Sequence, residues 1–123
     1  MALGGGSAEG DQSETVNGVS FLGKVIQGLG GKELKGLVDE AKAKLGSGVV
    51  MMVGVSEDGK ASLVVGVTDD LTDKFNAVDL VKKGAEAVGG KGGGGRPDMA
   101  QAGGPDGGMA NDAVAAIKAQ ISA

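Results

Sequence analysis

Two short apolar segments separated by a tight turn constrain the fold of this chain more than any other feature. The run Val49–Val53, with Val55 just beyond it, is continuously apolar and rich in branched residues. Leu63–Val67 has the same character, and Ser56–Gly59 between them has the composition of a turn, with a glycine available for positive φ. Such runs indicate strands buried on both faces. The sequence therefore predicts a hairpin whose covering layers must be supplied by helices.

The rest of the patterned sequence supplies one more strand and three helices. Val16–Ile26 is typical of a strand. Lys32–Leu45 has apolar residues at helical spacing and is followed by Gly46, a common helix stop. Asn76 can cap a second helix. Asp106 can cap a third, whose apolar side comprises Ala110, Ala113, Val114, Ile117 and Ile121.

These elements predict an α/β (α+β) fold, a small and mainly antiparallel sheet with three helices packed on it and a glycine-rich loop before the last helix. The 123 residues fit one domain. Residues 1–15 are mostly Gly, Ser and acidic residues, which favour a flexible linker, and residues 16–123 form the domain. A linker at the start suggests a piece of a longer protein.

Composition excludes several classes of chemistry. The chain has no Cys and no His, which removes disulfides, most transition-metal sites and His-based catalysis, although a carboxylate site for Mg²⁺ remains possible. Aromatic residues make up 2% of the chain, so the core must be aliphatic and includes Met51 and Met52. No secretory signal and no run long enough to span a membrane is present, so we expect a cytoplasmic protein.

The distribution of charge is more informative than its sum. The net charge of −4 argues against a general nucleic-acid binder. However, the second half of the chain has a locally basic zone around a glycine-rich segment. This zone contains Lys74, Lys82, Lys83, Lys91 and Arg96. It is either a solvated helix face or a binding surface for phosphates.

The segment from Gly89 to Gly108 is half glycine. It is either a flexible linker or a structured loop whose exposed N–H groups can bind an anion, and the interrupting Lys, Arg, Pro and Met favour the second. It does not match a phosphate-binding P-loop, because Arg96-Pro97 follows Gly95 in place of Lys-Ser/Thr. It does not match a dinucleotide-binding fingerprint either, because a helix precedes it.

Within this segment Arg96 is the strongest candidate for a phosphate or base contact, since its guanidinium can bind such acceptors in a bidentate manner. A salt bridge to Asp98 is the alternative role. Lys91 is either a phosphate contact or a solubilising charge, and Gln101 could read a base. Met99 and Met109 are more typical of packing than of ligand binding.

The string GGKGGGGRPDMAQAGG, residues 89–104, resembles the C-terminal signature of bacterial alanyl-tRNA synthetases, which typically reads GGxGGGRPDMAQAGG. The resemblance extends to Asn17–Val19, Val49–Val67 and Asp69–Lys74. The same region is similar to the accessory domain of DHH-type phosphoesterases. Those proteins usually carry His after the glycines, where this chain has Arg96, which favours the synthetase branch.

The resemblance implies a tRNA-binding accessory domain that contacts the tRNA elbow and aids aminoacylation and editing by the rest of the enzyme. The expected partners are tRNA(Ala), the other domains of the same synthetase and a possible homodimer, with no membrane. The fragment itself is expected to be catalytically inert and to need no cofactor, because ATP, Mg²⁺ and Zn²⁺ belong to other domains of the synthetase. The candidate nucleic-acid contacts are Lys74, Lys91, Gly93, Gly94, Arg96, Asp98 and Gln101.

Two other functions stay open at this stage. A protein-interaction or oligomerisation module would use the small residues from Gly103 to Ala110 for close contact. A nucleotide-cleaving enzyme is disfavoured, because the His and carboxylate clusters of two-metal hydrolysis are absent.

Overall fold

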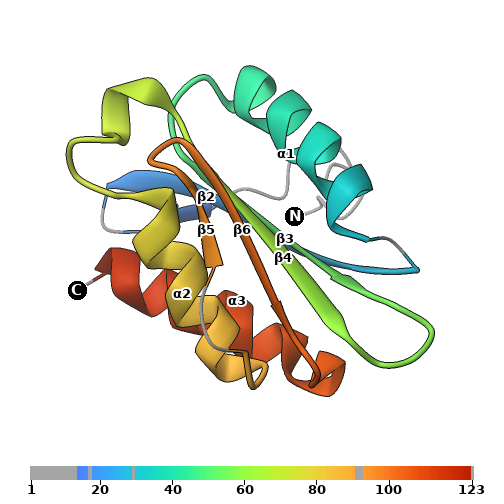
Figure 1. Cartoon of the computed structure of the whole chain (residues 1–123). Helices are drawn as coiled ribbons and strands as arrows, with labels where there is room; N and C mark the ends of the chain where they lie inside the picture. The colour runs from blue at the N-terminus through green and yellow to red at the C-terminus, as the bar shows by residue number, and fades with distance from the viewer. Residues whose placement is uncertain (1–13, 17, 29, 91–92, 123) are drawn as a thin grey trace, which may run out of the picture.

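The computed structural model describes residues 14–122 except residues 17, 29 and 91–92. In this part of the chain a six-stranded sheet has the order β1-β2-β3-β4-β6-β5, and three α-helices pack on it (Figure 1). The strands are β1 (Glu14–Val16), β2 (Val19–Gln27), β3 (Val49–Val55), β4 (Ala61–Val67), β5 (Gly93–Arg96) and β6 (Met99–Gly104). The helices are α1 (Gly31–Leu45), α2 (Ala77–Ala87) and α3 (Ala110–Ser122), with short 3₁₀ turns η2 (Asp69–Leu71) and η3 (Gly107–Met109).

The expected mainly antiparallel sheet is confirmed. Only β2 and β3 run parallel among the described strand pairs, because α1 carries the chain between them. The predicted central hairpin is present, with Val49 opposite Val67 and Val55 opposite Ala61. Its turn contains Gly59 at φ 86°, the left-handed conformation that glycine adopts without strain.

Helices cover both faces of the sheet, as two continuously apolar strands require. On one face Leu34 and Val38 of α1 pack against Val50, Met52 and Val64 of the central strands. On the other face α2 and α3 enclose the larger core, which contains Phe21, Met51 and Leu63 together with Leu80 and Ile117. None of the described helices has both the length and the apolar character needed to cross a bilayer.

Two helix ends follow the sequence prediction. The Asn76 side chain accepts a hydrogen bond of 2.9 Å from the Val78 N–H, which caps α2. Gly46 ends α1 at φ 78°. The predicted cap at Asp106 is wrong, because its side chain makes no capping bond and α3 begins only at Ala110. The turn between Asp106 and α3 is instead joined to the β3–β4 turn, because the Gly107 N–H donates a hydrogen bond of 2.7 Å to the Gly59 carbonyl.

Three further expectations differ from the structure. The single strand predicted over residues 16–26 is two antiparallel strands, because the chain reverses at Gly18, whose φ is 79°. The sheet includes Glu14 and Thr15, which the sequence placed in the linker, while residues 1–13 lie outside the described residues. Met109, expected to pack, is 38% exposed.

The largest difference concerns the glycine-rich segment before the last helix. It is not a loop, because β5 and β6 form an antiparallel hairpin that extends the sheet beyond β4. Successive side chains of β6 from Met99 to Ala102 point to alternate faces of the sheet. The surrounding glycines have no side chains, so this alternation is hard to recognise in the sequence. β6 thereby pairs with the edge of β4 that does not contact β3, along Ala61–Gly66.

Candidate nucleic-acid interface

The β5–β6 hairpin forms because two of its glycines allow the strands to approach closely. A Cβ on Gly93 would collide with the Gln101 carbonyl oxygen, and one on Gly95 would collide with that of Met99. Gly95 also has φ 147°, a conformation that residues with side chains rarely adopt. The glycines at these two positions are therefore requirements of the fold.

The tip of the hairpin is fixed to three other elements. The Val67 N–H at the end of β4 donates to the Asp98 carbonyl at 2.9 Å, and the Ala77 N–H at the start of α2 donates to the Pro97 carbonyl at 2.8 Å. From α1, Lys42 Nζ donates to the same Asp98 carbonyl at 3.1 Å and lies 3.7 Å from its carboxylate. This arrangement gives the tip a defined position relative to α1.

Arg96 is the exposed cation at this tip. Its side chain is 76% exposed, and its Nε lies 3.6 Å from Asp98 Oδ1. An ion pair this exposed contributes little to stability, so the guanidinium can exchange that partner for a phosphate. Asp98, which the sequence placed among the nucleic-acid contacts, is paired with both Lys42 and Arg96 and acts here as their counter-charge.

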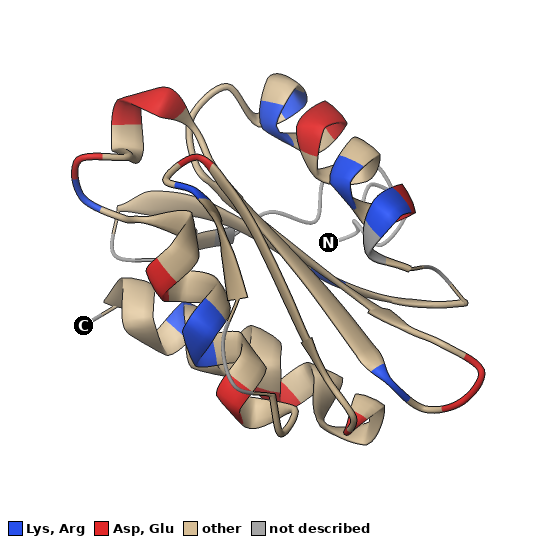
Figure 2. Ribbon diagram, in the orientation of Figure 1, with Lys and Arg blue, Asp and Glu red and all other residues tan. Residues whose placement is uncertain are grey.

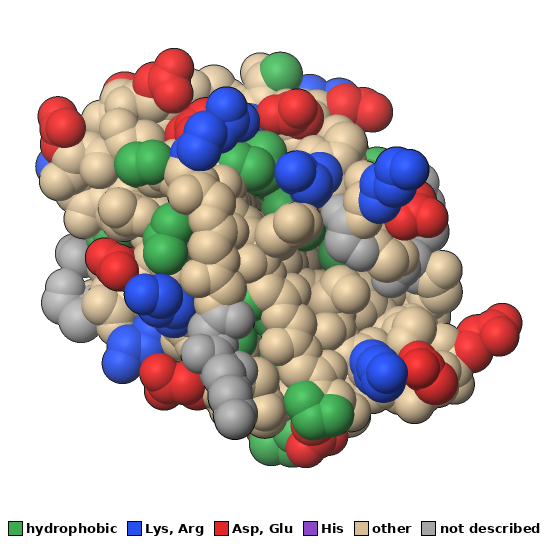
Figure 3. Space-filling model, viewed as in Figure 1, with side chains coloured by type: hydrophobic (Ala, Val, Ile, Leu, Met, Phe, Trp, Pro, Cys, Tyr) green, Lys and Arg blue, Asp and Glu red, His purple; other side chains and the backbone are tan. Residues whose placement is uncertain are grey.

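Beyond α1 the sheet presents an uncovered surface, which we call the open face. The strand register places Gly94 opposite Gln101, and Gly103 opposite Ser62, on the same side as α1. α1 packs over β3 and β4, and Gly94 and Gln101 are exposed beside it. Figure 3 shows this region as a largely tan surface with blue Lys and Arg side chains around its margin. The open face consists of Ser62, Gly94, Gln101 and Gly103.

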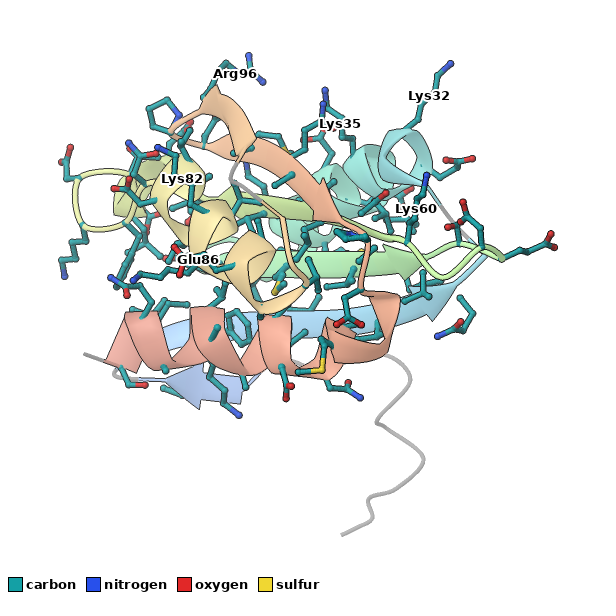
Figure 4. All side chains as sticks on the ribbon, turned by 60° about the horizontal axis from the view of Figure 1, so that its bottom comes forward. Lys32, Lys35, Lys60, Lys82, Glu86 and Arg96 are labelled. Carbon is teal, nitrogen blue, oxygen red and sulfur yellow. The ribbon has the colours of Figure 1, made fainter. Side chains whose placement is uncertain are left out.

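Cations from several elements surround the open face. Lys32, Lys35 and Arg96 project from the same side of the molecule in Figure 4, and Lys60 stands at the end of the face near the β3–β4 turn. Lys82 of α2 lies toward the β5 edge. All five are exposed. Acidic side chains lie among them: Lys60 Nζ is 3.8 Å from Asp58 in the β3–β4 turn, Arg96 is paired with Asp98, and acidic segments occur on α1 and α2 as well as on η2 (Figure 2).

The structure distributes the predicted contacts unevenly. Gly94, Arg96 and Gln101 share the α1 side of the hairpin, whereas Gly93 has the alternate strand position. Lys74 lies in the exposed segment after η2, whose continuation at Ala77 bonds to the hairpin tip. Lys91 lies outside the described residues.

Sequence reasoning missed Lys32, Lys35 and Lys60, because they precede the glycine-rich segment, which begins at Gly89, by 29 residues or more. One signal was available for α1. Lys35 and Lys42 are seven residues apart and therefore lie on the same side of the helix.

A second polar cluster lies at the far end of α1. Asp39, Lys42 and Asp98 line a shallow hollow with Asp69 and Asp70. Hydrogen bonds from Ser47 and then Thr68 hold the pKa of the Asp70 carboxyl below its ordinary value. In the described ranges no three His, Cys, Asp or Glu side chains are grouped so as to hold a metal ion.

Comparison with known proteins relates this geometry to a family. The family model described as the DHHA1 domain matches residues 18–123. The chain is 61% identical to the alanine–tRNA ligase of Mesorhizobium japonicum and 60% identical to that of a Chelativorans species (strain BNC1). These matches cover 100% and 99% of the chain but only 14% of each ligase.

The fold has a matching solved structure. The crystal structure of the C-Ala domain from Aquifex aeolicus alanyl-tRNA synthetase has a TM-score of 0.83 and 30% sequence identity, over 90% of this chain and 98% of that one. The chain therefore belongs to the DHHA1 domain family, as a C-Ala domain of the alanyl-tRNA synthetases.

Proposed function

We propose that this chain is a tRNA-binding accessory domain of an alanine–tRNA ligase. It binds folded tRNA(Ala) at the elbow and aids aminoacylation and editing by the other domains of that cytoplasmic enzyme. ATP, Mg²⁺ and Zn²⁺ serve those other domains, and this domain carries no catalytic step of its own. The names of its relatives support the ligase, and the surface around the β5–β6 hairpin supports the binding of RNA.

One observation carries the proposal. In a chain whose net charge is −4, exposed cations from α1, α2, the β3–β4 turn and the hairpin surround one uncovered part of the sheet. A polyanion gains from such a surface by releasing its condensed counterions, and each phosphate neutralised adds to the salt dependence of binding. The cations are few, so we expect weak binding by the isolated chain.

The test is a titration of fluorescently labelled folded tRNA(Ala) with the 123-residue chain at two or more salt concentrations. The variant is Arg96→Ala, and its control is Lys44→Ala on the other flank of α1. We expect Arg96→Ala to weaken binding and to lower the slope of log K against log salt by about one unit, and Lys44→Ala to do neither.

Two outcomes contradict the proposal. Failure of the wild-type chain to bind folded tRNA in low salt means that the basic surface has another role. Equal affinity for an unstructured RNA of similar length excludes recognition of the elbow. Sedimentation of the same samples reports whether a homodimer forms and whether Arg96→Ala affects it.

A further inference from the structure

One glycine of the open face has no explanation within the fold. Gly93 and Gly95 are required by the close approach of β5 to β6, as described above. Gly94 lies between them, yet a Cβ at that position would have no heavy atom within 4 Å, and its φ is not in the left-handed region. Glycine weakens a strand at such a position relative to residues with side chains. No contact among the described residues requires glycine at this position, and the missing side chain leaves the backbone of β5 accessible on the open face.

The flank of α1 beside the open face can be identified from Lys42. The aliphatic part of Lys42 lies over Gly66 of β4, where a Cβ would meet Lys42 Cδ at 2.6 Å, and its ammonium group bonds to Asp98 at the hairpin tip. Lys35 is two helical turns earlier on the same flank. It is exposed and projects from the same side of the molecule as Arg96 (Figure 4). Lys35 and Arg96 thus lie at opposite margins of the open face.

The positions of the aromatic side chains indicate which kind of RNA this surface suits. Proteins that bind unpaired bases stack them on aromatic side chains. Of the two aromatic residues in this chain, Phe21 is 1% exposed in the core and Phe75 packs against that core. A flat surface of peptide groups with cations at its margins matches a sugar–phosphate backbone, which is recognised by shape and charge.

We propose that the open face is the binding surface for the sugar–phosphate backbone of base-paired RNA. Lys35 of α1 and Arg96 of the hairpin contact phosphates at its two margins, and Gly94 carries no side chain so that the RNA can approach the sheet. This assignment rests on the proposed function. It adds Lys35 as a second phosphate contact, the open face between Lys35 and Arg96 as the contact surface, and base-paired RNA as the class of ligand.

The experiment compares substitutions on the open face with matched ones that point away from it. Gly94→Ala is matched by Gly36→Ala, since Gly36 also has open space at its Cβ position and no left-handed φ. Gly36 is two residues from both Leu34 and Val38, which are fully buried, so it lies on the outer side of α1. Lys35→Gln is matched by Lys44→Gln on the same helix, and Gly94→Val tests a larger side chain.

The ligands are folded tRNA(Ala), a base-paired RNA hairpin and an unpaired RNA of the same length. We expect affinity for both folded RNAs to fall progressively from wild type to Gly94→Ala to Gly94→Val, by about tenfold for valine, while thermal melts show no loss of stability. Lys35→Gln lowers the salt slope by about one unit. Gly36→Ala and Lys44→Gln bind as wild type does.

Each contrary result has a distinct meaning. If Arg96→Ala weakens binding but Lys35→Gln and Gly94→Val do not, the inference is wrong and the proposed function stands. A lower melting temperature for Gly94→Val shows that the fold requires this glycine, which overturns the argument. Equal affinity for the unpaired RNA refutes the class of ligand. If wild type binds neither folded RNA, the proposed function fails as well.

Discussion

Glycines that pack under a helix and the uncovered glycine of the open face have different surroundings. On the face covered by α2 and α3, a Cβ on Gly23 would lie 2.8 Å from Val114 Cγ1, and one on Gly84 would lie 2.9 Å from Ile117 Cδ1. These glycines allow helices to pack closely. On the open face Gly94 has only solvent at the corresponding place. Glycine thus marks close packing wherever a helix covers the sheet, as at Gly66 beneath Lys42 and Val38 of α1, and an uncovered strand position at Gly94.

The faces also differ in what covers the hairpin. α2 packs against β5 and β6, so Ala100 on that side is 2% exposed. On the other side α1 extends over β3 and β4 but leaves Gln101 exposed. A fold that required only a stable sheet could cover both sides of the hairpin. The asymmetry indicates that the face covered by α2 and α3, which we call the closed face, provides stability and that the open face is available for contact.

The largest effect that tests this comparison comes from substituting a large residue on each face. Phe21 on the closed face is 1% exposed, so Phe21→Ala should lower the free energy of unfolding by about 3–5 kcal/mol. Gln101→Ala on the open face should change it by less than about 0.5 kcal/mol. Urea unfolding of both variants measures the difference. A loss near that of Phe21→Ala at Gln101 would show that the open face is part of the core.

The next effect concerns two neighbouring glycines of β5. Gly95→Ala places a Cβ against the Met99 carbonyl in a conformation with φ 147°, which should cost about 1–3 kcal/mol. Gly94→Ala should leave stability unchanged or raise it by about 0.5–1 kcal/mol, because alanine is less flexible in the unfolded chain. Thermal unfolding and hydrogen exchange of β6 amides distinguish them. Equal losses at both positions would contradict the separate roles assigned to them.

A smaller effect of the opposite sign is expected on the outer side of α1. Gly36→Ala should stabilise the chain by about 1 kcal/mol, since the glycine is exposed within a helix and its Cβ position is open. Ala43→Gly, at an exposed position one heptad later, should cost a similar amount. Unfolding of both variants and of the double variant checks the pair, and the double variant should return close to wild type.

Much of the fold could be predicted, because its central elements carry large side chains. The apolar runs of β3 and β4 gave the hairpin, and the helical spacing of Leu34 and Val38 gave α1. The β5–β6 hairpin could not be predicted in this way. A strand is recognised by alternating side chains, and a segment in which half of the positions are glycine provides too few of them.

The candidate site was only partly accessible for a related reason. Arg96 and Gln101 stand within one short segment, so sequence alone could associate them. Lys35 and Lys60 come beside that segment only because β6 pairs with β4 and α1 crosses the same sheet. That order of strands depends on long-range pairing, which no local pattern specifies. Asp98 stays a candidate RNA contact, and its salt bridge with Arg96 was an alternative that the sequence offered, whereas its pairing with Lys42 of α1 was not.

The smallest effect concerns the acidic end of the molecule, where hydrogen bonds to Asp70 join the segment after α1 to the segment after β4. The Asp70 carboxylate accepts hydrogen bonds from Ser47 after α1, at 2.5 Å, and from Thr68 after β4, at 2.6 Å. Both bonds lower the pKa of Asp70 in the folded chain, with Ser47 the larger cause. Their contribution to stability is therefore present above the unfolded pKa and is lost as pH falls through the folded value. On acidification below about pH 4, Asp70→Asn should lose less stability than wild type, because asparagine does not titrate.

Melting temperatures from pH 7 to pH 2.5 measure this, and Ser47→Ala should have an intermediate effect. If wild type and Asp70→Asn have parallel profiles, this network does not link α1 to β4.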